Sequence, residues 1–304
     1  MKWQLISTAA VLAMAFGSAN VMAASEANVS QQGSFNEASV DQTSNYSAKA
    51  DIDVLGHLNK TYVTQSNNPS AKAKITVLGW GESNIANISN RNVQAGWSNI
   101  SIRGHNNDMA IVQKNTKNTS ANIRVTGWGT HNKGTITVKG VDNSTANIKV
   151  VSASKGEAHI SQQGGYKKTS SDLHANIKQD WGVRNSAWIT QSGTSKDSTI
   201  MQAGYWNSAA VVQSGGQYNS TADIIQSGKR NSGAINQTGS RHTASIEQHG
   251  SKNESHILQT SSRNQAAVYQ NGHNNIGNII QGSAGNVATV SQTGNFNKAY
   301  VNQH

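Results

Sequence analysis

The sequence predicts an all-β fold, a β-solenoid of stacked two-stranded rungs (strand, arch, strand) with the cross-β character of an amyloid. Two observations predict it. Between Gln226 and Gln303 a glutamine recurs every eleven residues, in the phrase Gln-x-Gly-x-x-Asn-x-Ala-x-(Ile/Val)-x. Such a period is typical of one supersecondary unit stacked on copies of itself. The repeated glutamine also lies on the apolar face of the unit, and stacked Gln and Asn side chains are typical of cross-β polymers.

The first 24 residues precede the array and are predicted to be a secretory signal peptide. After Lys2, an apolar run from Leu5 to Phe16 is followed by small residues up to Ala23 and Ala24. The run is too short to span a bilayer and ends in a cleavage-like site. We therefore expect export through the periplasm and one repeat domain over residues 25–304, with about 24 strands in about 12 rungs.

The composition agrees with an exported stack of small layers. The chain has no Cys, so its fold is held without disulfides. Aromatic residues make up 6% and hydrophobic residues 35%, which is lean for one large globular core. The net charge of +10 keeps strand edges from random pairing, or attracts polyanionic surfaces such as lipopolysaccharide, extracellular DNA or acidic polysaccharide. No basic run is dense enough to predict a specific nucleic-acid partner.

Each repeat unit reads as one strand followed by one tight arch. Ala244, Ile246 and Gln248 are two residues apart, so in a strand they share the inward face, while Glu247 points to water. The segment x-Gly-x-x-Asn that follows is rich in turn-forming residues. Two units make one rung, and successive rungs lie about 4.8 Å apart.

The middle of the chain supports two units per rung, because polar and apolar residues alternate at the positions equivalent to the repeated glutamine. Two-unit rungs place all the polar positions on one sheet and all the apolar positions on the other, as a ladder of like side chains requires. These positions are Gln42, Val54, Gln65, Val77, Asn90, Ile102, Gln113 and Val125.

Two irregularities are expected to lie outside the regular strands. The seventeen-residue step from Gln162 to Gln179 predicts a loop around residues 166–168. Three Trp-Gly pairs are expected in arches, with exposed platforms for sugar rings as the alternative. The pairs are Trp80-Gly81, Trp128-Gly129 and Trp181-Gly182.

The candidate site is the array itself. The predicted structural ladder consists of Gln31, Asn36, Gln42, Gln191, Gln202, Asn207, Gln213, Gln226, Asn231, Gln237, Gln248, Asn253, Gln259, Asn264, Gln270, Asn275, Gln281, Asn286, Gln292, Asn297 and Gln303. The predicted arch glycines are Gly33, Gly193, Gly204, Gly215, Gly228, Gly239, Gly250, Gly272 and Gly294.

With these residues in place, the chain resembles the curlin family, the subunits of the curli amyloid fibres of bacteria. The family phrase Ser-x5-Gln-x-Gly-x-x-Asn-x5-Gln is matched twice in full, and its half-unit form continues to Gln303. The two full matches are Ser25, Gln31, Gly33, Asn36 and Gln42, and Ser220, Gln226, Gly228, Asn231 and Gln237. The resemblance implies a major fibre subunit or a surface-bound nucleator, partnered by its own copies, by another curli-type subunit and by secretion and assembly accessory proteins.

The predicted function is therefore structural. We expect a self-assembling functional amyloid subunit of extracellular, cell-surface fibres (a curli-like pilus or fimbrium) that supports cell adhesion and biofilm matrix. The alternative is a secreted β-solenoid adhesin that binds glycans or other polyanions without polymerising. No catalytic residue, metal site or cofactor is predicted. His242, His249 and His256 fall at different points of the unit, and no paired carboxylates recur as a polysaccharide-cleaving enzyme would need.

Overall fold

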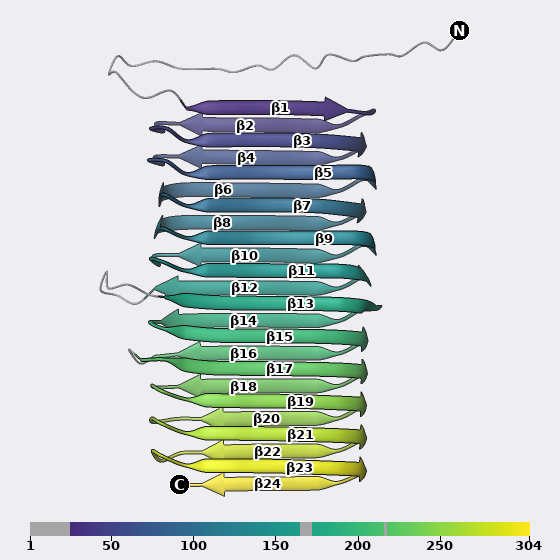
Figure 1. The fold of residues 1–304 in the computed structure, drawn as a ribbon, viewed down its shortest axis with the longest axis vertical. Coiled ribbons are helices and arrows are strands. Elements are labelled where there is room, and N and C mark those ends of the chain that lie inside the picture. Colours follow the sequence, from purple (N-terminus) through teal and green to yellow (C-terminus); the bar gives the residue numbers. More distant parts are fainter. Residues whose placement is uncertain (1–24, 165–171, 216–217) are drawn as a thin grey trace.

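The chain is a single stack of parallel strands in two sheets, so the predicted fold class is confirmed (Figure 1). The computed structural model describes residues 25–164, 172–215 and 218–304, without the side chains of residues 79–81 and 128. The predicted signal peptide, the loop around residues 166–168 and the side chains of Trp80 and Trp128 lie outside the described residues. The described residues contain no helix that could cross a membrane.

The odd-numbered strands form one twelve-stranded sheet, which we call sheet A, and the even-numbered strands form the other, sheet B. Sheet A contains β1 (Glu26–Gln32), β3 (Lys49–His57), β5 (Lys72–Glu82), β7 (Trp97–His105), β9 (Ser120–Thr130), β11 (Thr145–Ser154), β13 (Leu173–Val183), β15 (Lys196–Tyr205), β17 (Ser220–Lys229), β19 (Thr243–Ser251), β21 (Gln265–His273) and β23 (Val287–Asn295). Sheet B contains β2 (Glu37–Thr43), β4 (Lys60–Ser66), β6 (Ile85–Gln94), β8 (Asp108–Lys117), β10 (Lys133–Lys139), β12 (Glu157–Gly164), β14 (Ser186–Gly193), β16 (Ser208–Ser214), β18 (Ser232–Thr238), β20 (Glu254–Gln259), β22 (Ile276–Gln281) and β24 (Lys298–Gln303).

Each strand pairs in parallel with the strand two places on, so one rung takes two repeat units. Gln42 of β2 lies beside Gln65 of β4 in sheet B, while Val54 of β3 lies beside Val77 of β5 in sheet A. Asn90 and Gln113 continue the polar column in sheet B, and Ile102 and Val125 continue the apolar column in sheet A. The alternation in the middle of the sequence thus corresponds to two separate columns, as the two-unit rung requires.

The strands are longer than the expected length of about five residues. They range from 6 to 11 residues, because the backbone ladder of sheet A continues into the bend at the end of each strand. The three Trp-Gly pairs correct an expectation, since their backbones lie within β5, β9 and β13 and not in the arches. Trp181 lies at a register shift between Asp180 and Gly182 of β13. Trp181 is 72% exposed, so the shift inserts one outward residue without disturbing the inward face.

The core is one continuous cluster between the two sheets. In β19 the inward residues are Ala244, Ile246 and Gln248, and all three are buried. Alternating inward and outward residues give each strand one buried face and one exposed face, as the period of two predicts. The cluster extends from Ala50 to Val290, and only the first and last rungs are partly open.

Candidate functional site: the amide ladders and the two ends of the stack

Inward glutamine side chains form two hydrogen-bonded columns, one in each sheet. In every step the Nε2 of one glutamine donates to the Oε1 of the glutamine in the next rung, at 2.8–3.1 Å. The sheet A column consists of Gln179, Gln202, Gln226, Gln248, Gln270 and Gln292. The sheet B column consists of Gln162, Gln191, Gln213, Gln237, Gln259, Gln281 and Gln303.

The second hydrogen of each amide ties the two sheets together. Gln226 Nε2 donates to the Ser208 carbonyl of the opposite sheet at 2.8 Å, and Gln248 Nε2 donates to the Ser232 carbonyl at 2.9 Å. A buried amide is stable only when its donors and acceptor are satisfied. The ladder meets this condition by using one donor along the stack and one donor across it.

Two glutamines have an unpaired amide oxygen at the point where their column changes from apolar to polar. Gln162 Oε1 and Gln179 Oε1 are buried and accept no hydrogen bond within the described residues. Gln162 follows Val138 in sheet B, and Gln179 follows Val150 in sheet A, so neither has an amide below it to donate. Gln42 and Gln65 form a separate short step at 2.8 Å near the N-terminal end.

A second ladder, of asparagines, follows the arches that lead from sheet A to sheet B. Asn253 is representative: its backbone N–H donates to Asn231 Oδ1 at 3.1 Å, and its Nδ2 donates to the Gly272 carbonyl at 3.0 Å. The side chain therefore replaces backbone hydrogen bonds that the bend would leave open. The column consists of Asn36, Asn59, Asn84, Asn107, Asn132, Gly156, Asn185, Asn207, Asn231, Asn253, Asn275 and Asn297.

The arches from sheet B to sheet A carry a less regular column. The predicted Asn264 and Asn286 lie here, where the Asn286 N–H donates to Asn264 Oδ1 at 2.9 Å. The Asn264 N–H donates to His242 Nδ1 at 3.4 Å, so a histidine takes the place of asparagine one rung below. This side of the stack therefore tolerates other residue types in the same position.

Sequence reasoning omitted five asparagines of the first arch column. Asn59 and Asn107 follow the apolar positions Val54 and Ile102 by five residues, the same offset as in the glutamine units. The offset of five residues was therefore the available signal. In the other three units inserted Trp or Gly residues lengthen the offset, and the residues concerned are Asn84, Asn132 and Asn185.

The predicted arch glycines all have positive φ, from +67° to +128°. Gly33, Gly215 and Gly239 lie between strands, and the other six lie in the last two residues of a strand, not in the arch itself. A Cβ at Gly228 would overlap the Gly250 carbonyl oxygen of the next rung, so that position requires glycine both for its backbone angle and for space. Gly294, in the last rung, has the same backbone angle but no such neighbour. The glycine column therefore permits close stacking of one bend on another.

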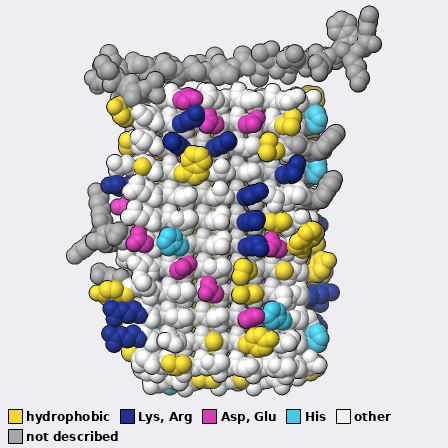
Figure 2. Space-filling model, in the orientation of Figure 1, with side chains coloured by type: hydrophobic (Ala, Val, Ile, Leu, Met, Phe, Trp, Pro, Cys, Tyr) yellow, Lys and Arg dark blue, Asp and Glu magenta, His cyan; other side chains and the backbone are white. Residues whose placement is uncertain are grey.

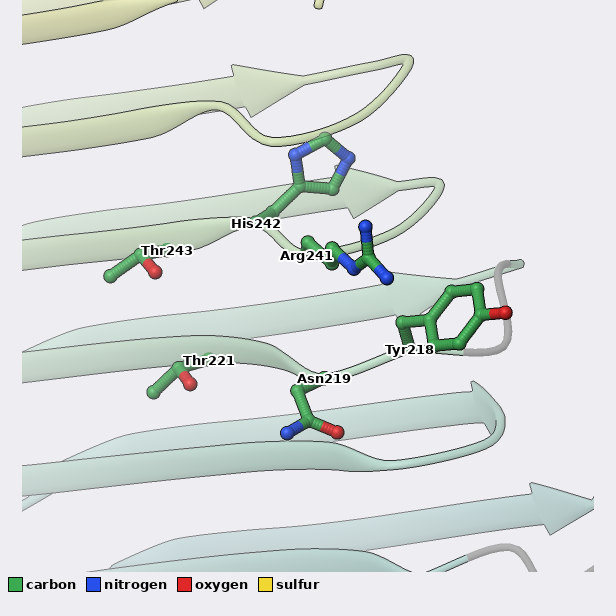
Figure 3. A pocket seen from close by; sticks show the side chains of 6 residues that line it. All are labelled: Tyr218, Asn219, Thr221, Arg241, His242 and Thr243. Carbon is green, nitrogen blue, oxygen red and sulfur yellow. The ribbon is translucent and has the colours of Figure 1, made fainter. Parts of the chain in front are cut away.

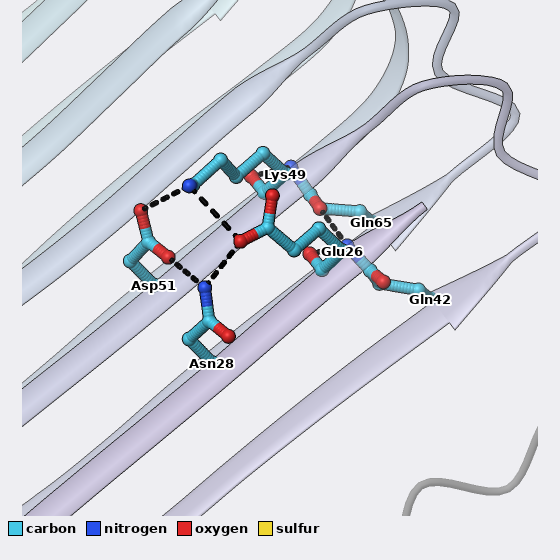
Figure 4. Close-up of polar contacts among 6 residues, drawn as sticks. All are labelled: Glu26, Asn28, Gln42, Lys49, Asp51 and Gln65. Carbon is cyan, nitrogen blue, oxygen red and sulfur yellow. Dashed lines mark hydrogen bonds and ion pairs between the residues drawn. The ribbon is translucent and has the colours of Figure 1, made fainter. Parts of the chain in front are cut away.

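The first rung is attached to the second by polar contacts on its outward face (Figure 4). Glu26 accepts from Asn28 at 2.6 Å and pairs with Lys49 at 3.1 Å, while Asn28 also donates to Asp51 at 2.9 Å. The hydrogen bond from Asn28, and then Lys49, lower the pKa of the Glu26 carboxyl. These contacts leave the inward side of the end strand available.

A small surface hollow of about 470 Å³ lies beside the sheet B to sheet A arches around His242 (Figure 3). Arg241 stacks over the Tyr218 ring at 4.5 Å to its centroid. The buried Lys196 Nζ donates to the Gly239 carbonyl at 3.4 Å. Burial lowers the pKa of Lys196 and of His242. Among the described residues, the titratable side chains that line the hollow are Tyr218, Arg241 and His242. No carboxylate lies among them to form an acid–base pair with His242.

In the described ranges no three His, Asp or Glu side chains are grouped to hold a metal ion.

A family model, described as curlin associated repeat, matches residues 218–250. This segment spans β17, β18 and most of β19, where both glutamine columns and the asparagine column are continuous. No curated protein matches the chain. The repeat match supports a relationship to the curlin family.

Proposed function

We propose that this relative of the curlins is a structural, non-enzymatic subunit that polymerises end to end into an extracellular, cell-surface amyloid fibre. The curlin repeat and the β-solenoid fold fit a curli-like structural protein. Export by the predicted signal peptide, adhesion, a contribution to biofilm matrix, and help from accessory proteins belong to the same proposal. The observation that carries it is the match between the two ends of the stack.

The first and last rungs are near copies of one another. Residues 26–43 and 287–304 align without a gap and are identical at ten positions. Both rungs therefore present the same inward residues, bends and arch asparagine. The identical pairs are Ala27/Ala288, Val29/Val290, Ser30/Ser291, Gln31/Gln292, Gly33/Gly294, Phe35/Phe296, Asn36/Asn297, Ala38/Ala299, Val40/Val301 and Gln42/Gln303.

Gln31 fits a second copy of the chain better than it fits its own. Its neighbour in the same molecule is Val54, which has no amide. Gln31 Nε2 is buried without a hydrogen-bond partner among the described residues. In sheet A, Gln292 Nε2 donates to the carbonyl of Ile276, the first residue of the preceding sheet B strand. By the same pattern the acceptor for Gln31 is the Lys298 carbonyl of a copy stacked on β1 and β2.

Stacking of the two copies in this way also continues the sheet A glutamine column and the asparagine column across the junction. The Nε2 of Gln292 in one copy donates to Gln31 Oε1 of the next, as Gln270 does to Gln292 at 2.8 Å. The Oδ1 of Asn297 accepts from the backbone N–H of Asn36, as Asn275 accepts from Asn297 at 3.0 Å. The junction therefore repeats a bonding pattern already present inside the molecule.

The outer surface of the junction is complementary as well. Phe35 and Phe296 are the only phenylalanines after residue 24, and they are 85% and 74% exposed in the two end arches. Stacking the copies places one ring above the other and removes apolar surface from water. Lys298 comes to lie beside Glu37, which already neighbours Lys60 at 3.9 Å in its own molecule.

The experiment compares assembly of the parent chain with Gln31→Ala and Gln32→Ala. The parent chain should form fibres that bind an amyloid dye and diffract at about 4.8 Å along the fibre axis. Gln31→Ala should leave the unfolding midpoint of the monomer unchanged and lengthen the lag of assembly several-fold. Gln32, exposed on the outward face beside it, is the matched control and should behave as the parent.

A parent chain that stays monomeric for days at micromolar concentration would refute the proposal and favour the non-polymerising adhesin. Equal lag times for the two variants would retain polymerisation but exclude this junction.

A further inference from the structure

A column of exposed side chains, four of them basic and one a tryptophan, follows the outer edge of the sheet A to sheet B arches over five successive rungs. Each residue precedes the position of the arch asparagine, which is Gly156 after Lys155, and has a positive φ between +54° and +59°. The backbone N–H of each donates to the preceding rung, for example Arg230 to the Tyr205 carbonyl at 2.9 Å. We call this column, with one adjacent lysine, the basic arch stripe: Lys155, Arg184, Trp206, Lys229, Arg230 and Lys252.

The charges of the basic arch stripe are exposed and not neutralised by the protein. No ion pair joins any of its five cations to a carboxylate within the described part of the chain. Glu157 and Glu254 follow the stripe by two residues but form no ion pair with it. Basic and hydrophobic side chains gather along this edge of the stack in Figure 2. Like charges held one rung apart favour an anionic partner.

Trp206 holds the middle of the stripe in place. The guanidinium carbons of Arg184 and Arg230 lie 5.8 and 5.3 Å from its ring centroid, and Lys229 Nζ lies at 5.3 Å. These cation–π contacts fix the cations on a rigid backbone and reduce the entropy lost on binding. Tyr205, 52% exposed beside Trp206, adds an apolar surface of the kind that packs against the C–H face of a sugar ring.

We propose that the basic arch stripe binds a linear acidic polysaccharide that lies parallel to the axis of the stack. The stripe carries cations on four of its five rungs, with Trp206 on the third, so its charges lie at multiples of about 4.8 Å, the spacing of hydrogen-bonded strands. An extended polyuronate carries one carboxylate per sugar ring, a repeat close to one rung. Duplex DNA carries a phosphate about every 3.4 Å along each strand, which falls out of step within a few rungs. The spacing therefore favours the polysaccharide over nucleic acid.

The stripe lies on the side of the stack, away from both end rungs, so this inference goes beyond fibre formation and does not require it. A Gln31→Ala chain that remains monomeric should bind the polysaccharide as the parent does. Failure of polymerisation and failure of binding are therefore distinguishable.

The test measures binding of the full chain to polygalacturonate, with its methyl-esterified form as the uncharged control. The triple variant Arg184→Asn, Arg230→Asn, Lys252→Asn removes three charges and keeps the fold, because Asn106 and Asn274 occupy the same column with the same positive φ. Its affinity should fall about tenfold, and added salt should weaken the parent in the same direction. Methyl-esterified polymer should not bind.

The matched control removes three charges from the face of sheet A. Arg124, Lys149 and Lys178 lie side by side on β9, β11 and β13, next to Ser101 of β7 in the same column. Arg124→Ser, Lys149→Ser, Lys178→Ser should change the affinity by less than about twofold. Equal losses of affinity in the two triple variants would show that binding depends only on the net charge of the protein, and would overturn the stripe as a site. Tighter binding of duplex DNA than of polygalacturonate would overturn the ligand class.

Discussion

At the scale of the residue, the side-chain amide decides how this stack is held together. A carboxamide has two donor hydrogens and one acceptor oxygen. Gln248 uses all three, toward Gln270, Ser232 and Gln226. The same group without a neighbour is a cost, as at Gln162 and Gln179, whose oxygens have no partner among the described residues. Whether a buried amide makes all its hydrogen bonds therefore depends on the residue at the same position in the neighbouring rung, and one substitution tests this.

Val138→Gln should stabilise the fold. Val138 lies between Gln113 and Gln162 in sheet B. A glutamine at this position would accept a hydrogen bond from Gln113 Nε2 and donate one to Gln162 Oε1, which has no partner among the described residues. Joining the two columns should raise the unfolding free energy by about 1–2 kcal/mol, measured by denaturant titration of the monomer.

Val150→Gln is the control for that substitution. It satisfies Gln179 Oε1, but its own oxygen then faces Val125 without a donor. It should give no gain, and equal stabilisation by both substitutions would contradict the ladder as the cause.

At the scale of the element, the arches determine how closely rungs approach. Bends with glycine at positive φ let the carbonyl of the next rung sit where a Cβ would otherwise lie. Asparagines then supply the hydrogen bonds that the bent backbone cannot make. Because every arch depends on the rung beside it, the same substitution has different consequences inside the stack and at its end.

Gly250→Ala should destabilise the monomer more than Gly294→Ala does. The two glycines have φ of +104° and +102°, so both substitutions carry the same backbone strain, about 1–3 kcal/mol. Only Gly250 also has a carbonyl, that of Gly272, in the way of a Cβ. Unfolding midpoints of the two monomeric variants measure the difference.

In fibre assembly the order of the two variants should reverse: Gly294→Ala should slow assembly more than Gly250→Ala does. Gly294→Ala places its methyl where the Gly33 carbonyl of an incoming copy would lie, so assembly should slow by more than the backbone strain in the monomer explains. Normal assembly of this variant would show that the C-terminal rung is not the docking edge.

Acid should weaken the arches around His242. Burial lowers the pKa of His242 below its ordinary value of 6.5, and the charge of Lys196 lowers it further. The unfolded chain then binds a proton at a higher pH than the folded chain, so the unfolding free energy falls as the pH drops below about 6.5. His242→Asn introduces the residue type that Asn264 has at the same place in the next rung, and it should flatten this dependence.

His159 is a second, partly buried histidine that should contribute to the acid sensitivity independently of His242. Burial also lowers its pKa, so part of the acid sensitivity should persist in His242→Asn. Stability curves of parent and variant between pH 4 and 8 that superimpose would assign the effect to other groups.

At the scale of the whole molecule, the stack has a regular half and an irregular half. From Gln162 and Gln179 onward both glutamine columns continue without a break to the last rung. Before them, the columns contain Val and Ile, and the arches contain inserted residues. A regular half offers an incoming chain the same contacts at every rung, so it should be the better template.

A fragment of residues 196–304 should seed the full chain faster than one of residues 25–139. Each fragment contains ten strands in five rungs and one end rung of the stack. The difference between them is the continuity of the amide columns, and the lag time of the full chain with each seed measures it. Equal seeding would mean that the end rung alone determines templating.

The sequence by itself determined the architecture, because its information is local. An eleven-residue period and a two-residue alternation specify which side chains face inward, and the alternation of Gln with Val requires two units per rung. Only the tertiary structure decided which residues complete the ladders, where amide atoms are left unpaired and which cations share an edge. Asn132 donates to Asn107, and Trp206 lies between Arg184 and Arg230, across 22 to 25 residues of intervening chain. Inserted residues shift such partners in the sequence, and the hydrogen-bonded spacing of the rungs brings them back into one column.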